Sequence, residues 1–330
     1  MEFTRRNTIK SLAIGTLAGF TAEQTEAARS NNIIELEQIE RWGLTHDRVW
    51  IGGEFWSNPM EDWRINDGWA QCQTTAEHRS LHSVTRQVTD ISQSFAMGVE
   101  LSRSAMIKQD GGAGFKLGVK SDLNEHRSNM FARSGIIAGV VQDELVLAGA
   151  REKLSRVNEN GHIRLSIIAS RKGDNYVLQL SASDPETNER LGDVRKEVPA
   201  QSCLGNISLV SQYTGPKQRY NIPGYKFRNW LAGGKALCHA LNQRFGPILW
   251  TMYSLSDSRS KDGFVLKLST LTGPLGKEDH KEVELQVRLD DKWTTIGKST
   301  LHEDAWTATF RVPNWDATRD TPYRVLYDQK

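Results

Sequence analysis

Short runs in which apolar and polar residues alternate dominate the chain from residue 48 onward. In the stretch 283–289, Val and Leu alternate with Glu, Gln and Arg, so an extended backbone places the apolar side chains on one face. Comparable runs occupy 81–88, 95–101, 115–119, 136–141, 163–169, 176–180, 206–211, 225–231, 248–255, 264–271, 293–296, 306–312 and 323–327. Helical patterns of about 10–15 residues do not separate these runs. The pattern therefore predicts an all-β, antiparallel sandwich fold rather than a parallel α/β fold.

Two turn signals fix where neighbouring strands pair. Asn66-Asp67-Gly68 separates the run 63–65 from 69–72, and an Asp-Gly pair between two apolar runs is typical of a β-hairpin. Arg171-Lys172-Gly173-Asp174-Asn175 separates 163–169 from 176–180 in the same way. Each segment therefore predicts a hairpin.

The glycines at 233, 234 and 246, with Pro247, mark a break between two strand-rich regions. The region 48–236 has the strand content of a two-sheet jelly roll. The region 244–330 has six or seven strands, which is typical of an immunoglobulin-like or fibronectin III-like sandwich. Residues 29–47 show only a weak three-residue spacing of apolar side chains, so we expect a linker there.

The N-terminus has the pattern of an export signal. Arg5 and Arg6 precede an apolar, small-residue-rich segment at 11–22, which is too short to span a bilayer, and small residues follow at 27–28. This arrangement predicts a twin-arginine signal peptide over 1–28. We therefore expect the folded protein to be exported to the periplasm or the extracellular space.

Composition argues against nucleic acid and a stable membrane anchor as partners. The net charge is +2, with 42 basic and 40 acidic residues interspersed, so no basic stripe indicates nucleic-acid binding. No apolar stretch beyond the signal is long enough for a stable membrane anchor. Cys72, Cys203 and Cys238 lack the close spacing of a zinc site, and we expect buried free thiols, although one late disulfide stays an alternative.

No catalytic motif is recognisable. Serine–histidine and cysteine–histidine patterns, a phosphate-binding loop and a dinucleotide fingerprint are all missing. The carboxylates of the segment 184–189 suit a turn better than the acid/base pair of a glycosidase. His78 and His82 would lie about 13 Å apart on a strand, too far to share a metal ion, so we expect them to face solvent.

Two groups of residues are candidates for binding. The acidic loops at 110–112 and 122–125 could hold a structural calcium ion, although simple solvated turns explain them as well. Tryptophans cluster near the start of the jelly roll, and an aromatic ring can either stack on a sugar or fill a core. We expect two of the three to pack between the sheets and the exposed one to contact a glycan. The candidate substrate-binding residues are Trp56, Trp63, Trp69, Arg127 and Asn129.

Two segments resemble known families. The stretch from Gly53-Glu54-Phe55-Trp56 to Asp62-Trp63-Arg64-Ile65-Asn66-Asp67-Gly68 is similar to the opening of concanavalin A/LamG-type jelly rolls, including those of the 3-keto-disaccharide hydrolase type. The closing run 310–325 resembles the end of the immunoglobulin-like domain in exported metallophosphatases of the alkaline phosphatase D (PhoD-like) family. The signal, jelly roll and final sandwich follow one another in the order found there.

The second resemblance implies an accessory region of a phosphoric ester hydrolase. In that family the metal ligands lie in a catalytic domain beyond the matching segment, so the resemblance assigns no catalytic residue and no cofactor to this chain. It implies a downstream catalytic domain or a phosphatase subunit as the partner, with a glycan as a further ligand. The alternatives are a glycan-active jelly roll with an unrecognised acid/base pair, and a structural spacer.

Overall fold

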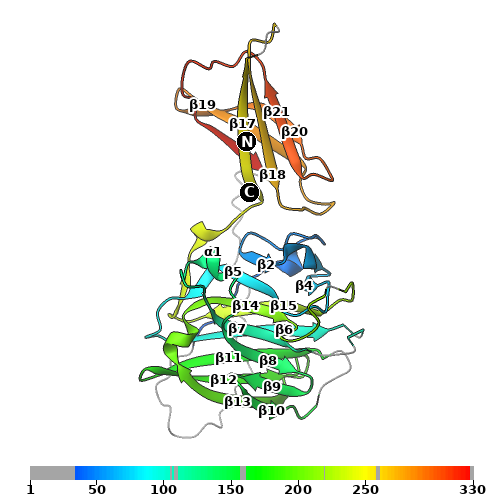
Figure 1. The fold of residues 1–330 in the computed structure, drawn as a ribbon, viewed down its shortest axis with the longest axis vertical. Helices are drawn as coiled ribbons and strands as arrows, with labels where there is room; N and C mark the ends of the chain where they lie inside the picture. The colour runs from blue at the N-terminus through cyan, green and yellow to red at the C-terminus, as the bar shows by residue number, and fades with distance from the viewer. Residues whose placement is uncertain are drawn as a thin grey trace, which may run out of the picture.

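The structure is a computed structural model that describes residues 34–104, 106–107, 111–156, 161–218, 220–257 and 261–327. The predicted signal peptide, with Arg5 and Arg6, lies outside these residues. Figure 1 shows two β-sandwiches, a larger one formed by the blue-to-yellow part of the chain and a smaller one formed by the yellow-to-red part. The all-β prediction of a jelly roll followed by a smaller sandwich is confirmed.

The jelly roll consists of two eight-stranded antiparallel sheets. Sheet A contains, in spatial order, β13 (Arg190–Pro199), β12 (Asn175–Ser183), β11 (Ile163–Lys172), β6 (Phe95–Arg103), β15 (Tyr225–Gly233), β4 (Trp69–Cys72) and β3 (Trp63–Asn66), with β1 (Glu37–Gln38) beside β15. Sheet B contains β10 (Ala150–Lys153), β9 (Glu144–Leu147), β8 (Ile136–Val141), β7 (Ala113–Val119), β14 (Gly205–Ser211), β5 (Arg79–Val88) and β16 (Leu237–His239), with β2 (Phe55–Asn58) beside β5. Short helical turns are α1 (His126–Asn129), η1 (Trp42–Leu44), η2 (Met60–Asp62), η3 (Ala200–Cys203) and η4 (Leu241–Gln243).

Alternation along the strands places the core of the jelly roll between its sheets. Met97 and Val99 of β6 and Phe115 and Leu117 of β7 are all buried in one hydrophobic cluster. Both predicted hairpins are present, since β3 pairs with β4 and β11 pairs with β12. In the first turn Asp67 and Gly68 adopt φ angles of 49° and 72°, a left-handed conformation that Asp tolerates and Gly favours.

Residues 34–47 are part of the jelly roll, so the expectation of a linker there is wrong for the part that the structure describes. β1 extends sheet A, and the side chains of Ile39 and Trp42 are buried in the core. The Trp42 indole N–H donates to the Ile51 carbonyl at 3.1 Å. The weak apolar spacing concealed this role because only two side chains of the segment enter the core.

The smaller sandwich packs two three-stranded antiparallel sheets against each other. One contains β17 (Ile248–Asp257), β18 (Phe264–Thr272) and β21 (Thr307–Val312), and the other contains β20 (Lys292–Thr300), β19 (Glu282–Leu289) and β22 (Tyr323–Tyr327). All six strands coincide with alternating runs in the sequence. Val283, Leu285, Leu266, Leu268 and Phe310 form the centre of its core.

Trp50 crosses the boundary between the two sandwiches. It precedes β2 of the jelly roll, yet its side chain is buried in the core of the smaller sandwich. The ring is closely fitted, because a Cβ added to Gly273 would lie 3.1 Å from Trp50 Cγ and one added to Gly246 would lie 2.9 Å from Cζ2. Arg48, two residues earlier, forms a nearly buried ion pair with Asp279 at 2.9 Å. The two sandwiches therefore share a packed contact.

The three cysteines are unpaired. Cys72 and Cys203 are buried, and Cys238 is half-buried. Burial raises the pKa of Cys72 to about 11 and that of Cys203 to about 12, so both are neutral thiols at pH 7.

Candidate functional site

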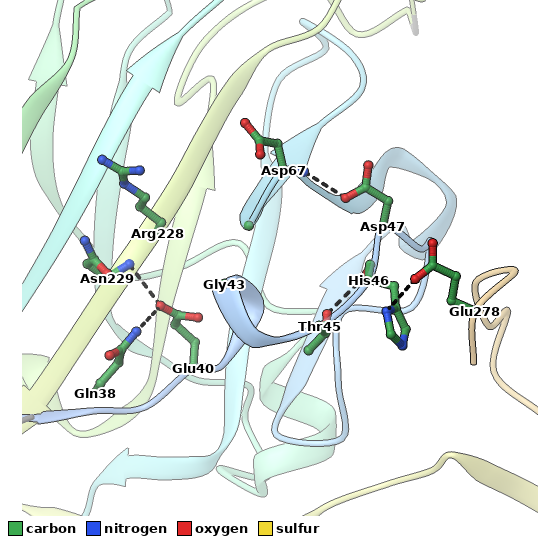
Figure 2. A pocket seen from close by; sticks show the side chains of 11 residues that line it. Gln38, Glu40, Gly43, Thr45, His46, Asp47, Asp67, Arg228, Asn229 and Glu278 are labelled. Atoms are coloured by element: carbon green, nitrogen blue, oxygen red, sulfur yellow. Dashed lines mark hydrogen bonds and ion pairs between the residues drawn. The ribbon is translucent and has the colours of Figure 1, made fainter. Parts of the chain in front are cut away.

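A polar hollow of about 590 Å³ lies where the two sandwiches meet, and we call it the boundary hollow (Figure 2). The segment before β2, the β3–β4 turn and β15 supply most of its lining, and Glu278 of the smaller sandwich completes it. Its lining residues are Gln38, Glu40, Gly43, Thr45, His46, Asp47, Asp67, Gly68, Arg228, Asn229 and Glu278. Four of them carry carboxyl groups, and Arg228 is the guanidinium among them.

Glu40 anchors the first segment to sheet A. The buried carboxyl accepts hydrogen bonds from Gln38 Nε2 at 2.7 Å, from the Asn229 backbone N–H at 3.0 Å and from the Trp42 backbone N–H. Burial raises the pKa of Glu40, although the three hydrogen bonds oppose the shift because they favour the carboxylate. Since both oxygens are engaged by the protein itself, Glu40 holds the wall in place rather than serving as a proton donor to a ligand.

Two contacts fix the rim. Asp47 Oδ1 accepts a hydrogen bond from the Asp67 backbone N–H at 2.8 Å, which ties the first segment to the β3–β4 turn. His46 Nδ1 lies 3.1 Å from Glu278 Oε2 across the boundary between the sandwiches. Figure 2 shows these pairs on the side of the hollow opposite Arg228 and Asn229. The rim therefore depends on both sandwiches.

Arg228 is held by an ionic cluster on sheet A. Its Nε donates to Glu100 Oε2 at 3.0 Å, and Arg164 Nη2 donates to Glu100 Oε1 at 3.0 Å. Burial alone would raise the pKa of Glu100, but the hydrogen bonds from Arg164 and Arg228 outweigh it and hold the pKa below its usual value. The ion pair with Glu100 thus holds the positively charged Arg228 guanidinium in a fixed orientation at the hollow.

Trp69 lies next to this cluster with its ring already covered. Arg228 Cζ lies 4.2 Å and Lys226 Nζ 4.4 Å from the ring centroid, both within cation–π range. The ring of His162 approaches at 5.6 Å. The indole therefore packs against protein cations.

The five predicted binding residues do not form one platform. Trp63 is fully buried in the core against Phe227, and of the three tryptophans it alone belongs to the cluster between the sheets, so the expectation of two is wrong. Trp69 packs on the opposite face of sheet A, and Trp56 on sheet B is half-buried. Asn129 is fully buried, where its side chain bonds to the Ser121 N–H and to Asn206. Arg127 is exposed on α1. A ligand contact for Trp56 stays a prediction.

The other sequence candidates have local roles. Asp184 accepts hydrogen bonds from the Glu186 and Thr187 backbone N–H groups, as a turn residue does, and these bonds lower its pKa. Glu125 caps α1 by accepting from the N–H groups of Arg127 and Ser128. Asp110 lies outside the described residues. Within the described ranges, no group of three or more His, Cys, Asp or Glu side chains is arranged to hold a metal ion, and calcium stays a prediction.

A second, smaller hollow of about 130 Å³ lies against sheet B, and we call it the sheet hollow. It is lined by Asn58, Pro59, Glu77, His78, Arg79, Ser80, His82, Lys116, Phe131, Ala132, Arg133 and Val210. The expectation that His82 faces solvent is wrong, because the loop after α1 covers this strand face and the residue is only 1% exposed. His78 lies in the turn before β5 with a φ of 58°. No sequence motif marks this hollow, since its residues come from five separate segments.

No protein-family model matches the sequence, and no curated protein matches it. Among solved structures, lectin II from Ulex europaeus is similar at 14% identity and a TM-score of 0.37, covering 55% of this chain and 91% of its own. Arcelin-5, a lectin-like defence protein from Phaseolus vulgaris, is 12% identical with a TM-score of 0.39, covering 58% and 97%. The carbohydrate recognition domain of Emp46p in its metal-free form is 12% identical with a TM-score of 0.35, covering 57% and 88%. These values carry no conclusion about function.

In the described part of the chain, no helix has the length and apolar character needed to cross a membrane.

Proposed function

We propose that the boundary hollow binds a neutral, hydroxyl-rich ligand of the glycan class. The observation that carries this proposal is its lining, in which four carboxyl groups and two amides stand against one guanidinium and one imidazole. Carboxylates and amide oxygens accept hydrogen bonds, so they complement the O–H donors of a sugar. The surplus of acidic groups disfavours an anionic ligand, and the scarcity of apolar groups disfavours an apolar one.

The position of the hollow also suits binding. Ligand sites occur preferentially between domains, where small movements can admit and enclose a ligand. Gly43 leaves part of the wall without a side chain, because a Cβ at this position would meet no atom within 4 Å. Asp67 and Gln38 line the hollow from two different segments of the chain (Figure 2).

Gly43→Phe tests the site by filling it. The added ring enters open space in η1, so the fold should keep its melting temperature while glycan affinity falls about tenfold or more through steric exclusion. Binding is measured on a glycan array and then by calorimetry with the best neutral oligosaccharide. Leu123→Phe, at an exposed position of the jelly roll outside the hollow, is the matched control and should bind as the wild type does. An array without hits, or unchanged affinity in Gly43→Phe, would contradict the proposal and favour a structural spacer.

We also propose that the two sandwiches form an exported accessory region that positions a phosphatase catalytic domain. The sequence resemblance supports this role, and the packed contact at Trp50 and Arg48 suits a rigid spacer. Export rests on Arg5 and Arg6 and stays a prediction. On this proposal the purified chain releases no p-nitrophenol from its phosphate mono- or diester when Zn²⁺, Ca²⁺, Mn²⁺ or Fe³⁺ is added. Metal-dependent turnover by the chain alone would contradict it.

A further inference from the structure

The sheet hollow contains polar groups that the fold itself does not satisfy. Leu81 and Phe115 belong to the core between the sheets, so alternation places Ser80, His82 and Lys116 on the opposite face of sheet B. The exposed ring of Phe131 forms part of the wall above them. This face is therefore polar at its floor and partly closed by the loop after α1.

Lys116 is a buried cation without a carboxylate partner among the described residues. Its side chain belongs to a residue that is only 8% exposed, and Nζ donates one hydrogen bond, to the Arg133 carbonyl at 2.7 Å. An ammonium group has three donors, so two remain for a ligand or water. Burial lowers the pKa of Lys116, and the charge of Arg133 lowers it further. An anion beside Nζ would favour the charged form of Lys116 and so oppose both effects on its pKa.

His82 supplies a second unsatisfied group. Its Nε2 lies 3.0 Å from Ser80 Oγ, whereas the buried Nδ1 has no hydrogen-bond partner. Burial lowers the pKa of His82 to about 3, and Lys116 adds to the shift, so the imidazole is neutral at pH 7. When Ser80 donates to Nε2, the proton of the neutral ring is on Nδ1, which makes Nδ1 a donor. A buried donor without a partner indicates a missing ligand or water.

The other charges that line the hollow leave a positive surplus. Arg79 is neutralised by Asp62, with its Nε 2.7 Å from Oδ2. Glu77 lies 3.7 Å from His78 Nε2, but burial lowers the pKa of His78, so the ring is neutral at pH 7 and Glu77 keeps one negative charge against those of Lys116 and Arg133. Arg133 is exposed at the rim and adds a further positive charge. The sheet hollow thus differs in sign from the boundary hollow.

We propose that the sheet hollow binds a small oxyanion group, a carboxylate or a phosphate carried by a small molecule. Lys116 Nζ is its charged partner, and Ser80, His82 and Asn58 supply the polar surroundings. This site is separate from the boundary hollow and does not depend on the function proposed there. The alternative is a purely structural lysine that holds the loop through the Arg133 carbonyl.

The test uses calorimetry and thermal unfolding of the full chain in a chloride buffer free of oxyanions. Glucuronate and glucose 6-phosphate are the probes, and glucose is the neutral control. We expect at least one of the two anions to bind and to raise the melting temperature more than glucose does, because only the anions can pair with Lys116. Binding of glucuronate alone identifies a carboxylate, binding of glucose 6-phosphate alone identifies a phosphate, and both results support the proposal.

Lys116→Met separates binding from structure. The substitution should weaken anion binding about tenfold or more, because a charged hydrogen bond is lost. It should also raise the melting temperature of the ligand-free protein, because it removes a buried, unpaired charge. Lys120→Met is the matched control. Lys120 lies directly after the end of β7, outside the hollow, and its Nζ also donates to a backbone carbonyl, that of Gln201, so the substitution should leave binding unchanged.

Two outcomes would overturn the proposal. Neither anion binding to the wild type would do so without any variant. Unchanged anion affinity in Lys116→Met would do so as well. If that variant also has a lower melting temperature without ligand, Lys116 has the structural role instead.

Discussion

The two sandwiches fill their cores in different ways. The jelly roll encloses its hydrophobic cluster between two eight-stranded sheets, with residues drawn from within 39–236. Among the described residues, the smaller sandwich has a cluster of nine buried residues, and the largest of them, Trp50, comes from the chain before β2 of the jelly roll. The point where the chain passes from one fold to the other is therefore not the point where one core ends and the next begins.

The contact at Trp50 has polar as well as apolar parts. The Trp50 backbone N–H donates to the Pro274 carbonyl at 3.1 Å. Arg48 Nη1 bonds to Asp279 Oδ1, and Arg48 Nε donates to the Trp50 carbonyl at 3.0 Å. Because Arg48 and Asp279 are both nearly buried, this pair is shielded from the screening that weakens surface ion pairs. The smaller sandwich thus depends on the jelly roll for part of its stability.

The largest expected effect follows from removing the shared ring. Trp50→Ala leaves a cavity in the core of the smaller sandwich and should lower the stability of that sandwich by about 3–5 kcal/mol. The jelly roll, whose core lacks Trp50, should keep its stability. Hydrogen exchange measured strand by strand compares β18 and β19 with β11 and β12.

Trp250→Ala is the matched control. Trp250 lies in β17 of the smaller sandwich and is 41% exposed, so its loss should change stability by less than about 1 kcal/mol. If Trp50→Ala leaves exchange in β18 and β19 at the wild-type rate, the smaller sandwich is self-sufficient and the comparison fails.

A smaller effect is the expected loss of jelly-roll stability at low pH through protonation of His82. The pKa of His82 is about 3 in the folded jelly roll and about 6.5 in an unfolded chain, so the unfolded state takes up a proton first as the pH falls. The stability contributed by the neutral ring is complete above pH 6.5 and is lost as the pH falls toward 3. The slope for one proton is about 1.4 kcal/mol per pH unit, and it should act on the jelly roll.

His82→Gln removes this titration. Between about pH 6.5 and 5, the unfolding free energy of the wild type should fall steadily relative to that of His82→Gln as the pH is lowered. Denaturant unfolding in a chloride buffer measures the difference. His239→Gln, at an exposed position of β16, is the control, and a wild-type slope in His82→Gln would disprove the assignment.

Strands and turns could be predicted from the sequence, whereas contacts between distant segments could not. Alternation predicts all six strands of the smaller sandwich, and Asp67-Gly68 predicts the β3–β4 hairpin of the jelly roll, because each feature depends on neighbouring residues. The destination of Trp50 depends on Leu275 and Gly273, more than 200 residues away, and an apolar ring fits either core equally well on its own. Composition alone therefore could not assign it.

The candidate sites show the same limit. Tryptophans near the start of the jelly roll were reasonable ligand contacts, but Trp63 fills the core and Trp69 packs against Arg228. His82 was expected to face solvent because strand alternation describes the two faces of a sheet, not what covers them. Neither hollow has a motif, since each is assembled from segments that only the fold brings together.

The fit between Trp50 and Gly273 has an evolutionary consequence. Gly273 needs no positive φ angle, so it is the indole ring and not the backbone that disfavours a side chain there, since an added Cβ would lie 3.1 Å from Trp50 Cγ. A side chain at position 273 is accommodated more easily once position 50 holds a smaller residue. In homologous sequences these two positions should therefore covary, with larger residues at 273 appearing only in lineages that have lost the tryptophan.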